Sequence, residues 1–416
     1  MSSELTAAAR ISPTPDTRPA VTVLAGFSPA ATLAVAQAVL VTDPDLLLVR
    51  HDLAGVRDGT VQRVVRTATR IVEDTEARVA GPATCTLHEV VLPELVRLSR
   101  EHPGRDILLV LPEALEPESL AAACRHCRIE DAPVHAALRF DSYVTVVDAR
   151  TAARDLRTSD DLRHRGMHVH HDDHRGVAEV VLNQIEYADT VVLWSEPGLD
   201  GYEVTRLATL LYRLAPWAEQ VVAGTDQTVD CTGLAARLRR TGRHDPTVPG
   251  MLGRALEGFP VGVHEPEPDC GVVSVLFETR RPFHPRRLHD ALPGLAEDAL
   301  RSRGQTWVAS QPDAAVSWES AGGGVSLGSL GYWLAALPSE RWREATDYRR
   351  AAADLGWDPY YGDRRTTLAF VGLGLDPTEL TARLSGCLLT DAEVAEGFTS
   401  WTTWPDPFAG CFPLTE

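Results

Sequence analysis

The chain has 416 residues, of which 44% are hydrophobic and 24% are charged, and its formal net charge is −18. This composition is typical of a soluble globular protein, and the length predicts two domains. No apolar run approaches the about 20 residues that cross a bilayer, so we expect a cytoplasmic protein with no membrane partner. The acidic balance disfavours direct DNA binding, because phosphate backbones are bound by clustered positive charge, and it favours a basic protein partner.

Residues 1–20 have neither a basic start nor a continuous apolar stretch, so we expect a disordered N-terminus rather than a signal peptide. Apolar strands and helical patterns then alternate over residues 21–240. Near-continuous apolar strands separated by helices indicate an α/β domain whose parallel sheet is covered on both faces. The predicted strands are 21–26, 45–51, 106–111, 142–149, 190–195 and 220–225, and a clear helical pattern covers 88–102.

Residues 241–269 are rich in proline, glycine and charged side chains, which predicts a linker between two domains. Short strands interrupted by two helices follow. This order indicates a smaller α+β domain over residues 270–416 with a mostly antiparallel sheet. The predicted strands are 272–283, 305–310, 315–320, 322–335 and 365–375, and the helices lie near 286–303 and 377–386.

The sequence GFSPAATLAVAQAVL at residues 26–40 follows the first predicted strand and continues into a predicted helix. A strand, a glycine turn and a helix N-terminus form the usual place for a nucleotide phosphate. Gly26 is the turn glycine, and Thr32 is the candidate for the hydroxyl that such a site directs at Mg²⁺. However, Pro29 has no amide to donate, and no second glycine follows. All 40 basic residues are arginine, so no lysine exists to reach the phosphates.

A second candidate site is the segment GMHVHHDDHRG at residues 166–176, which holds four histidines and two aspartates. Imidazole and carboxylate groups suit Zn²⁺, and His170 and His174 would share one face if the segment were helical. The alternative is a solvated polar segment with weak and unselective metal affinity. The candidate metal ligands are His168, His170, His171 and His174.

Several longer segments resemble the CobW-type metal-trafficking GTPase family along most of the chain. They are SYVTVVDA (142–149), NQIEYADTVVLW (183–194), VLFETRRPFHPRRL (275–288) and DPYYGDRRTTLAFVGLGLD (358–376). The resemblance implies a P-loop, Rossmann-like domain followed by the smaller CobW C-terminal domain. This agrees with the two domains that the strand and helix patterns predict.

The motifs that carry the family's chemistry depart from its pattern in this chain. The acidic Glu-x-x-Gly falls on residues 110–113, and the guanine-reading Asn-Lys-x-Asp falls on residues 194–197, where Pro197 replaces the carboxylate. The metal motif Cys-x-Cys-Cys falls on residues 82–85, where one thiol remains. We therefore expect a pseudo-GTPase with no catalytic residue. GTP is then a doubtful ligand, and zinc is the remaining candidate cofactor.

Within the family the chain is similar to an actinobacterial subgroup described as ribosome hibernation factor-recruiting proteins. This resemblance implies an adaptor whose partners are a ribosome hibernation factor and the ribosome, acting under zinc limitation. Two alternatives stay open. One is a GTP-dependent zinc or cobalt metallochaperone, and the other is a zinc buffer or sensor that uses the four histidines.

Overall fold

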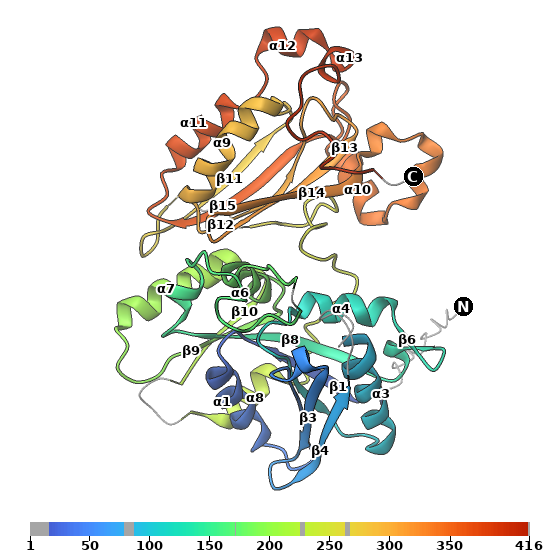
Figure 1. Ribbon diagram of the computed structural model, residues 1–416, viewed down its shortest axis with the longest axis vertical. Coiled ribbons are helices and arrows are strands. Elements are labelled where there is room, and N and C mark those ends of the chain that lie inside the picture. Colours follow the sequence, from blue (N-terminus) through green and yellow to red (C-terminus); the bar gives the residue numbers. More distant parts are fainter. Residues whose placement is uncertain (1–15, 79–86, 171, 225–228, 263–266, 415–416) are drawn as a thin grey trace, which may run out of the picture.

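The computed structural model describes residues 16–78, 87–170, 172–224, 229–262 and 267–414, and these residues form two large sheets (Figure 1). The fold is the predicted one, an α/β domain followed by a smaller antiparallel domain. Among the described residues, every helix is too short or too polar to cross a membrane. Most of the predicted disordered N-terminus lies outside the described residues, and Ala20 already belongs to the first strand.

The first sheet has eight strands in the order β10-β9-β8-β1-β5-β2-β3-β4. The six strands from β10 to β2 pair in parallel, as predicted, and β3 and β4 add an antiparallel hairpin that the sequence did not indicate. The strands are β1 (Ala20–Ala25), β2 (Leu47–Asp52), β3 (Thr60–Arg66), β4 (Ile71–Arg78), β5 (Ile107–Val110), β8 (Arg139–Asp148), β9 (Thr190–Trp194) and β10 (Glu219–Ala223); β6 (Arg128–Ile129) and β7 (Ala132–Pro133) form a separate small hairpin.

Helices cover both faces of this sheet, because side chains that alternate along each strand enter different cores. In β1, Val21 and Val23 pack in the core with α3 and α4, whereas Leu24 packs in the core with α1 and α8. Helices α6 and α7 cover the rest of the first face and also contact the second sheet. The helices are α1 (Pro29–Leu40), α3 (Leu92–Glu101), α4 (Pro117–His126), α5 (Ala152–Asp155), α6 (Val177–Glu186), α7 (Gly201–Leu214) and α8 (Cys231–Leu238).

The second sheet is antiparallel throughout, in the order β11-β15-β12-β13-β14. One predicted strand was shifted: β12 covers Arg301–Thr306 rather than 305–310, so helix α9 ends at Asp298 instead of reaching 303. The elements are β11 (Val272–Thr279), α9 (Pro285–Asp298), β12 (Arg301–Thr306), β13 (Ala314–Ala321), β14 (Gly324–Tyr332), α10 (Asp347–Leu355), β15 (Thr366–Leu373), α11 (Pro377–Gly386), α12 (Asp391–Glu396) and α13 (Phe398–Trp401).

Charged side chains are buried where helix α6 of the first domain meets the second sheet. The fully buried Glu186 carboxylate forms ion pairs of 2.7 Å with both Arg301 and Arg303 of β12. These two arginines are two residues apart on one strand, so both point to the same face. Arg301 also pairs with Glu319 at 2.9 Å. Removing one partner would leave an uncompensated buried charge, at a cost of about 3–5 kcal/mol, so this cluster requires that the two domains keep this contact.

Candidate functional site

The turn between β1 and α1 consists of only Gly26, Phe27 and Ser28. Ser28 caps the helix: its hydroxyl oxygen accepts a hydrogen bond from the Ala31 amide at 3.4 Å. The same hydroxyl donates to Asp148, at the end of β8, at 2.8 Å. The amides of Ala31 and Thr32 are therefore paired within the chain, with the hydroxyl and the carbonyl of Ser28.

The two predicted nucleotide-binding residues lie against each other at this turn. The Thr32 side chain is buried, and its hydroxyl donates to the Ser28 carbonyl at 2.9 Å. A methyl group added to Gly26 would collide with the Thr32 hydroxyl and with the carbonyl of Val146. The cavity that Gly26 and Thr32 line has a volume of about 10 Å³, which is the space of about one water molecule.

His51, at the end of β2, lines the same small cavity, and no pattern in the sequence predicted its place there. The residue is 2% exposed, and neither ring nitrogen has a hydrogen-bond partner among the described residues. Burial, with a smaller effect of the nearby Arg63 guanidinium, lowers the pKa of His51 to about 4. The imidazole is therefore neutral at physiological pH and provides no positive charge for a phosphate.

The segment at the guanine-reading position makes contacts within the chain. Glu196 forms an ion pair of 2.9 Å with Arg150, whose guanidinium also donates to the Pro197 carbonyl at 3.3 Å. Gly224, after β10, packs so closely on the Trp194 indole that an added methyl group would lie 3.0 Å from its ring. At the acidic motif position, the carbonyl of Glu113 accepts from the Gln184 amide at 2.8 Å.

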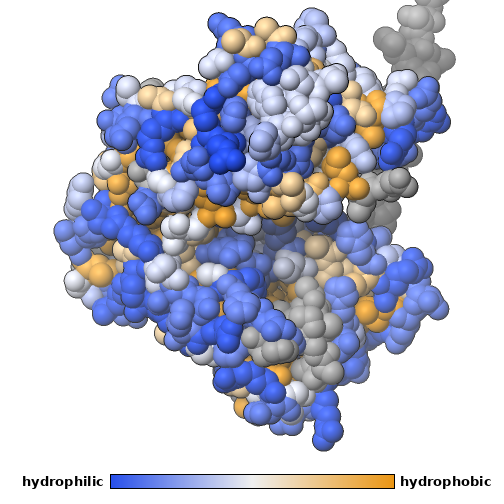
Figure 2. All heavy atoms as spheres, turned by 45° about the horizontal axis from the view of Figure 1, so that its top comes forward, coloured by the Kyte–Doolittle hydropathy of each residue, from blue (hydrophilic) through white to orange (hydrophobic). Residues whose placement is uncertain are grey.

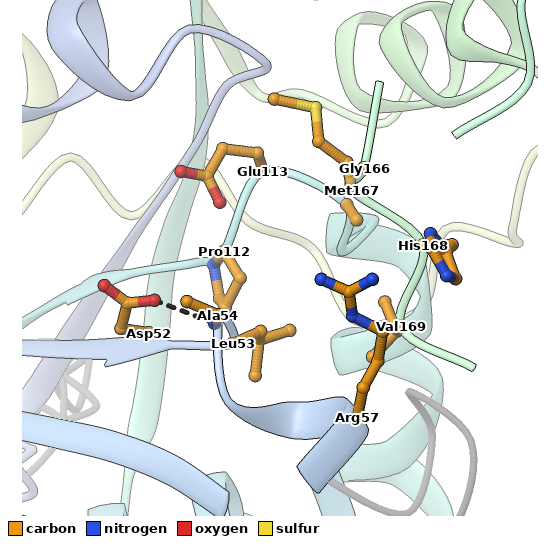
Figure 3. Close-up of a pocket in the computed structure, with 11 residues that line it drawn as sticks. Asp52, Leu53, Ala54, Arg57, Pro112, Glu113, Gly166, Met167, His168 and Val169 are labelled. Carbon is orange, nitrogen blue, oxygen red and sulfur yellow. Dashed lines mark hydrogen bonds between the residues drawn. The ribbon is translucent and has the colours of Figure 1, made fainter. Parts of the chain in front are cut away.

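A larger cavity of about 250 Å³ lies beside the ends of β2 and β5 (Figure 3). Asp52 and Glu113 line one side, and His168 lies beyond the Arg57 guanidinium as seen in Figure 3. Asp52 accepts from the Ala54 amide at 2.9 Å and also pairs with a neighbouring arginine on the same strand. The Arg57 guanidinium therefore lies between the carboxylates of Asp52 and Glu113 and the imidazole of His168.

The histidine segment is not helical over its described residues, so the condition for a shared face of His170 and His174 is not met. His170 lies 3.9 Å from Asp172, and His174 is exposed and contacts the Arg163 guanidinium at 3.2 Å. The Nδ1 atom of His168 is buried without a hydrogen-bond partner. The predicted ligand His171 lies outside the described residues.

No group of three or more potential metal ligands occurs among the residues that the structure describes. The remaining thiol of the cysteine motif, Cys85, belongs to residues 79–86, which are outside that part of the chain. The assignment of zinc to His168, His170, His171 and His174 therefore stays a prediction.

Comparison with known proteins connects this architecture to a family. Residues 272–388 match the cobalamin synthesis protein cobW C-terminal domain. A Mycobacterium tuberculosis protein named a zinc chaperone is 33% identical over 366 residues, which cover 84% of each chain. The zinc-regulated GTPase metalloprotein activator 1 of Dictyostelium discoideum is 28% identical over 340 residues, covering 79% of this chain and 68% of that protein.

This chain was also compared with the solved structure of the Zn(II)-bound YjiA GTPase from E. coli. The two align over 89% of this chain and 99% of the YjiA chain, with 16% sequence identity and a TM-score of 0.36. The sequence similarities confirm the resemblance that the strand and loop motifs indicated. The domain match and the identity to the M. tuberculosis protein show that this chain belongs to the CobW-type metal-trafficking GTPase family.

Proposed function

We propose that this chain is a pseudo-GTPase that works in zinc homeostasis as an adaptor, recruiting a ribosome hibernation factor to ribosomes when zinc is scarce. The observation that carries the proposal is the turn of Gly26, Phe27 and Ser28 between β1 and α1. We call it the filled turn, because the Thr32 side chain occupies the space above Gly26. A phosphate-binding loop wraps several backbone amides around its ligand. Here three residues span the turn, and the space beside Gly26 and Thr32 is about 10 Å³. A turn this short offers few amides to a triphosphate, which supports the proposal.

The fold around the filled turn is intact, since its strands remain fully buried and its helices pack on both faces. A domain that keeps its fold without its family's nucleotide motifs retains surfaces for binding other proteins. Figure 2 shows a face that is mostly hydrophilic, with apolar side chains in small scattered groups. Together with the net charge of −18, this surface is suited to a basic protein partner such as a ribosome-associated factor.

The adaptor role is tested by sedimentation of ribosomes from zinc-limited cells with and without the gene for this chain. We expect the hibernation factor to leave the ribosome fractions when the gene is removed and to return when the wild-type gene is restored. Zinc-replete cells serve as the control, because little factor should be bound there. Unchanged recruitment in zinc-limited cells that lack the gene would contradict the proposal.

The second candidate function is a GTP-dependent zinc metallochaperone, which the names of the two relatives favour. In such a protein Thr32 would hold Mg²⁺, so Thr32→Val should abolish nucleotide-dependent zinc transfer. In the adaptor the same substitution should leave ribosome recruitment unchanged. The Thr32 hydroxyl bonds only to the Ser28 carbonyl among the described residues, so the loss of stability should be about 1 kcal/mol.

A further inference from the structure

A cavity of about 590 Å³ lies at the amino end of the parallel sheet, opposite the filled turn. Its volume is within the range of small-molecule binding sites. Its walls come from the start of β8, the end of α4, the residue after α6 and the segment that follows α8. The lining residues that carry the inference are Arg125, Arg139, Phe140, Tyr143, Tyr187 and His244.

Aromatic rings form the wall of this cavity. Tyr143 lies at the centre, with ring centroids 5.5 Å from Tyr187 and 4.6 Å from His244, both in edge-to-face arrangements. Phe140 stacks 6.1 Å from Tyr143 on the same strand. Tyr143 is almost fully buried by these neighbours, so the apolar surface open to an aromatic or apolar ligand belongs to the partly exposed Phe140 and Tyr187.

The ionisable side chains that line the cavity are basic, although carboxylates lie next to three of them. Its lining contains three arginines and two histidines but no carboxylate, although the chain as a whole carries 58 acidic residues. Two of these arginines have acidic neighbours: Arg18 pairs with Asp16, and Arg139 pairs with Asp141 at 2.7 Å. Arg125 is exposed at the end of α4, and no described carboxylate lies within ion-pair distance of it. Its charge is therefore available to an anion.

The Tyr143 hydroxyl is the second polar group without a partner. The residue is 1% exposed, and no described residue hydrogen-bonds the hydroxyl. Burial raises the pKa of Tyr143, so the group stays protonated and can donate at neutral pH.

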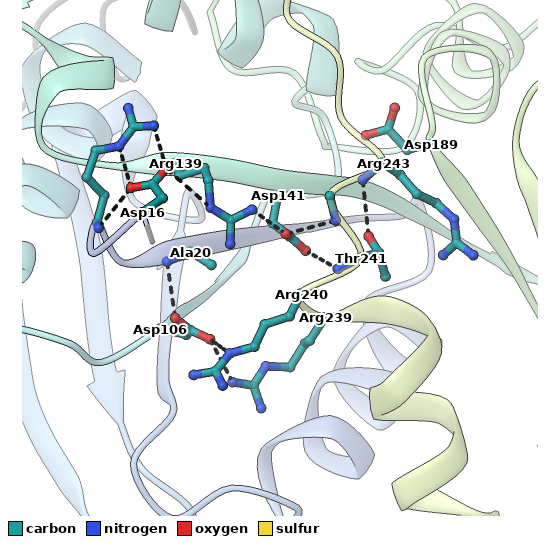
Figure 4. A network of polar contacts seen from close by, with 12 residues as sticks. Asp16, Ala20, Asp106, Arg139, Asp141, Asp189, Arg239, Arg240, Thr241 and Arg243 are labelled. Atoms are coloured by element: carbon teal, nitrogen blue, oxygen red, sulfur yellow. Dashed lines mark hydrogen bonds and ion pairs between the residues drawn. The ribbon is translucent and has the colours of Figure 1, made fainter. Parts of the chain in front are cut away.

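Hydrogen bonds hold the cavity walls in place before any ligand arrives (Figure 4). The fully buried Asp141 accepts from the amides of Thr241 and Gly242 at 2.9 and 3.1 Å. Asp189 accepts from the Tyr143 amide at 2.8 Å and lies 3.5 Å from His244. These contacts tie the segment after α8 to the strand that carries the aromatic rings. A site that is already ordered loses little conformational entropy on binding.

We propose that this cavity binds a small anionic molecule with an aromatic or apolar body. The body lies on Phe140 and Tyr187, and the acidic group lies toward Arg125. The inference does not depend on the proposed adaptor function, because it uses the opposite end of the sheet.

The test uses the full chain and the dye 8-anilinonaphthalene-1-sulfonate, an anionic aromatic probe whose fluorescence rises in apolar sites. We expect saturable binding of one dye per chain. Arg125→Gln should weaken it about fivefold or more, as expected for loss of one charged contact. Arg286→Gln is the matched control, since Arg286 is also exposed but lies on α9 in the second domain. It should leave binding unchanged.

Competition with the bound dye separates the contribution of the ligand's charge from that of its apolar ring. 1-Naphthoate should displace the dye, and the neutral 1-naphthamide should do so at least tenfold less well. Tyr143→Phe, which keeps the ring, should weaken naphthoate binding. The proposal is overturned if Arg125→Gln binds the dye as the Arg286→Gln control does, or if the neutral amide competes equally. Binding that does not saturate, or displacement by basic peptides but not by naphthoate, would also overturn it.

Discussion

The two ends of the parallel sheet differ in how the chain fills them. At the carboxyl end, where open α/β sheets usually bind their ligands, the space beside Gly26, Thr32 and His51 is about 10 Å³, and a cavity of about 250 Å³ lies next to it at the ends of β2 and β5. At the amino end, a cavity of about 590 Å³ is lined by aromatic rings and arginines. Both ends of the sheet therefore carry a cavity, and the two cavities differ in their lining: carboxylates with an arginine at the carboxyl end, aromatic rings with arginines at the amino end.

The structure of the amino end depends on the buried carboxylate of Asp141. Removing this carboxylate should change the free energy of unfolding more than any other substitution at the two ends. Asp141→Ala leaves two backbone amides without their partner and leaves Arg139 only Asp16, 3.8 Å away, so we expect a loss of about 3 kcal/mol in the free energy of unfolding. The expected change is a lower urea midpoint for the first domain. A loss below about 1 kcal/mol would show that the segment after α8 is held by other contacts.

His51 makes the carboxyl end sensitive to acid. Its pKa is about 4 in the folded chain and near 6.5 when unfolded, so the unfolded chain binds the proton first as the pH falls. Stability from the neutral ring is complete above pH 6.5 and is lost as the pH falls toward 4, by about 3 kcal/mol at most.

The comparison variant for this prediction is His51→Leu. Urea unfolding of wild type and variant should be measured at several pH values between 7 and 4. The variant should lose less stability than the wild type over that interval, since it has no ring to protonate. Parallel pH dependences for the two proteins would contradict the burial of a neutral imidazole.

The packing of the filled turn can be tested by adding one methyl group. Gly26→Ala should cost about 1–3 kcal/mol, because the new Cβ meets the Thr32 hydroxyl and a backbone carbonyl. Gly201→Ala at the start of α7 is the matched control, since a Cβ there has no atom within 4 Å. If both substitutions have equal effects on the urea midpoint, the turn is looser than described.

A smaller effect is expected at Asp148, the carboxylate of the filled end. It accepts from Ser28 at 2.8 Å and from the Arg150 amide at 2.9 Å, but it is only partly buried. Asp148→Asn should therefore cost about 1 kcal/mol by the same unfolding measurement. A cost as large as that of Asp141→Ala would remove the contrast between the two ends.

The parallel strands were predictable because they are apolar on both faces, and β1, β2, β5, β8, β9 and β10 all lie within two or three residues of their predicted ranges. The β3–β4 hairpin was missed, since β4 is mostly polar and no side chain in it is fully buried. Strand β12 was shifted because Arg301 and Arg303 look like solvent-exposed residues in the sequence. They are buried only because Glu186, more than a hundred residues away, neutralises them.

For the candidate site, the sequence placed Gly26 and Thr32 at the right turn, because the strand and helix around them have strong patterns. It could not show that Thr32 occupies the space above Gly26, since that depends on a turn of only three residues. The cavity around Tyr143 was not predictable at all. Its walls come from β8, α4 and the segment after α8, which are far apart in the chain.

Titration of the full chain with a fluorescent GTP analogue and Mg²⁺, with and without Zn²⁺, tests the filled turn most directly. A parallel assay should follow phosphate release from GTP. The three-residue turn, which has no lysine and no second glycine, predicts no saturable binding and no release above the buffer rate under either condition. Micromolar binding together with measurable phosphate release would contradict the pseudo-GTPase and would support the metallochaperone.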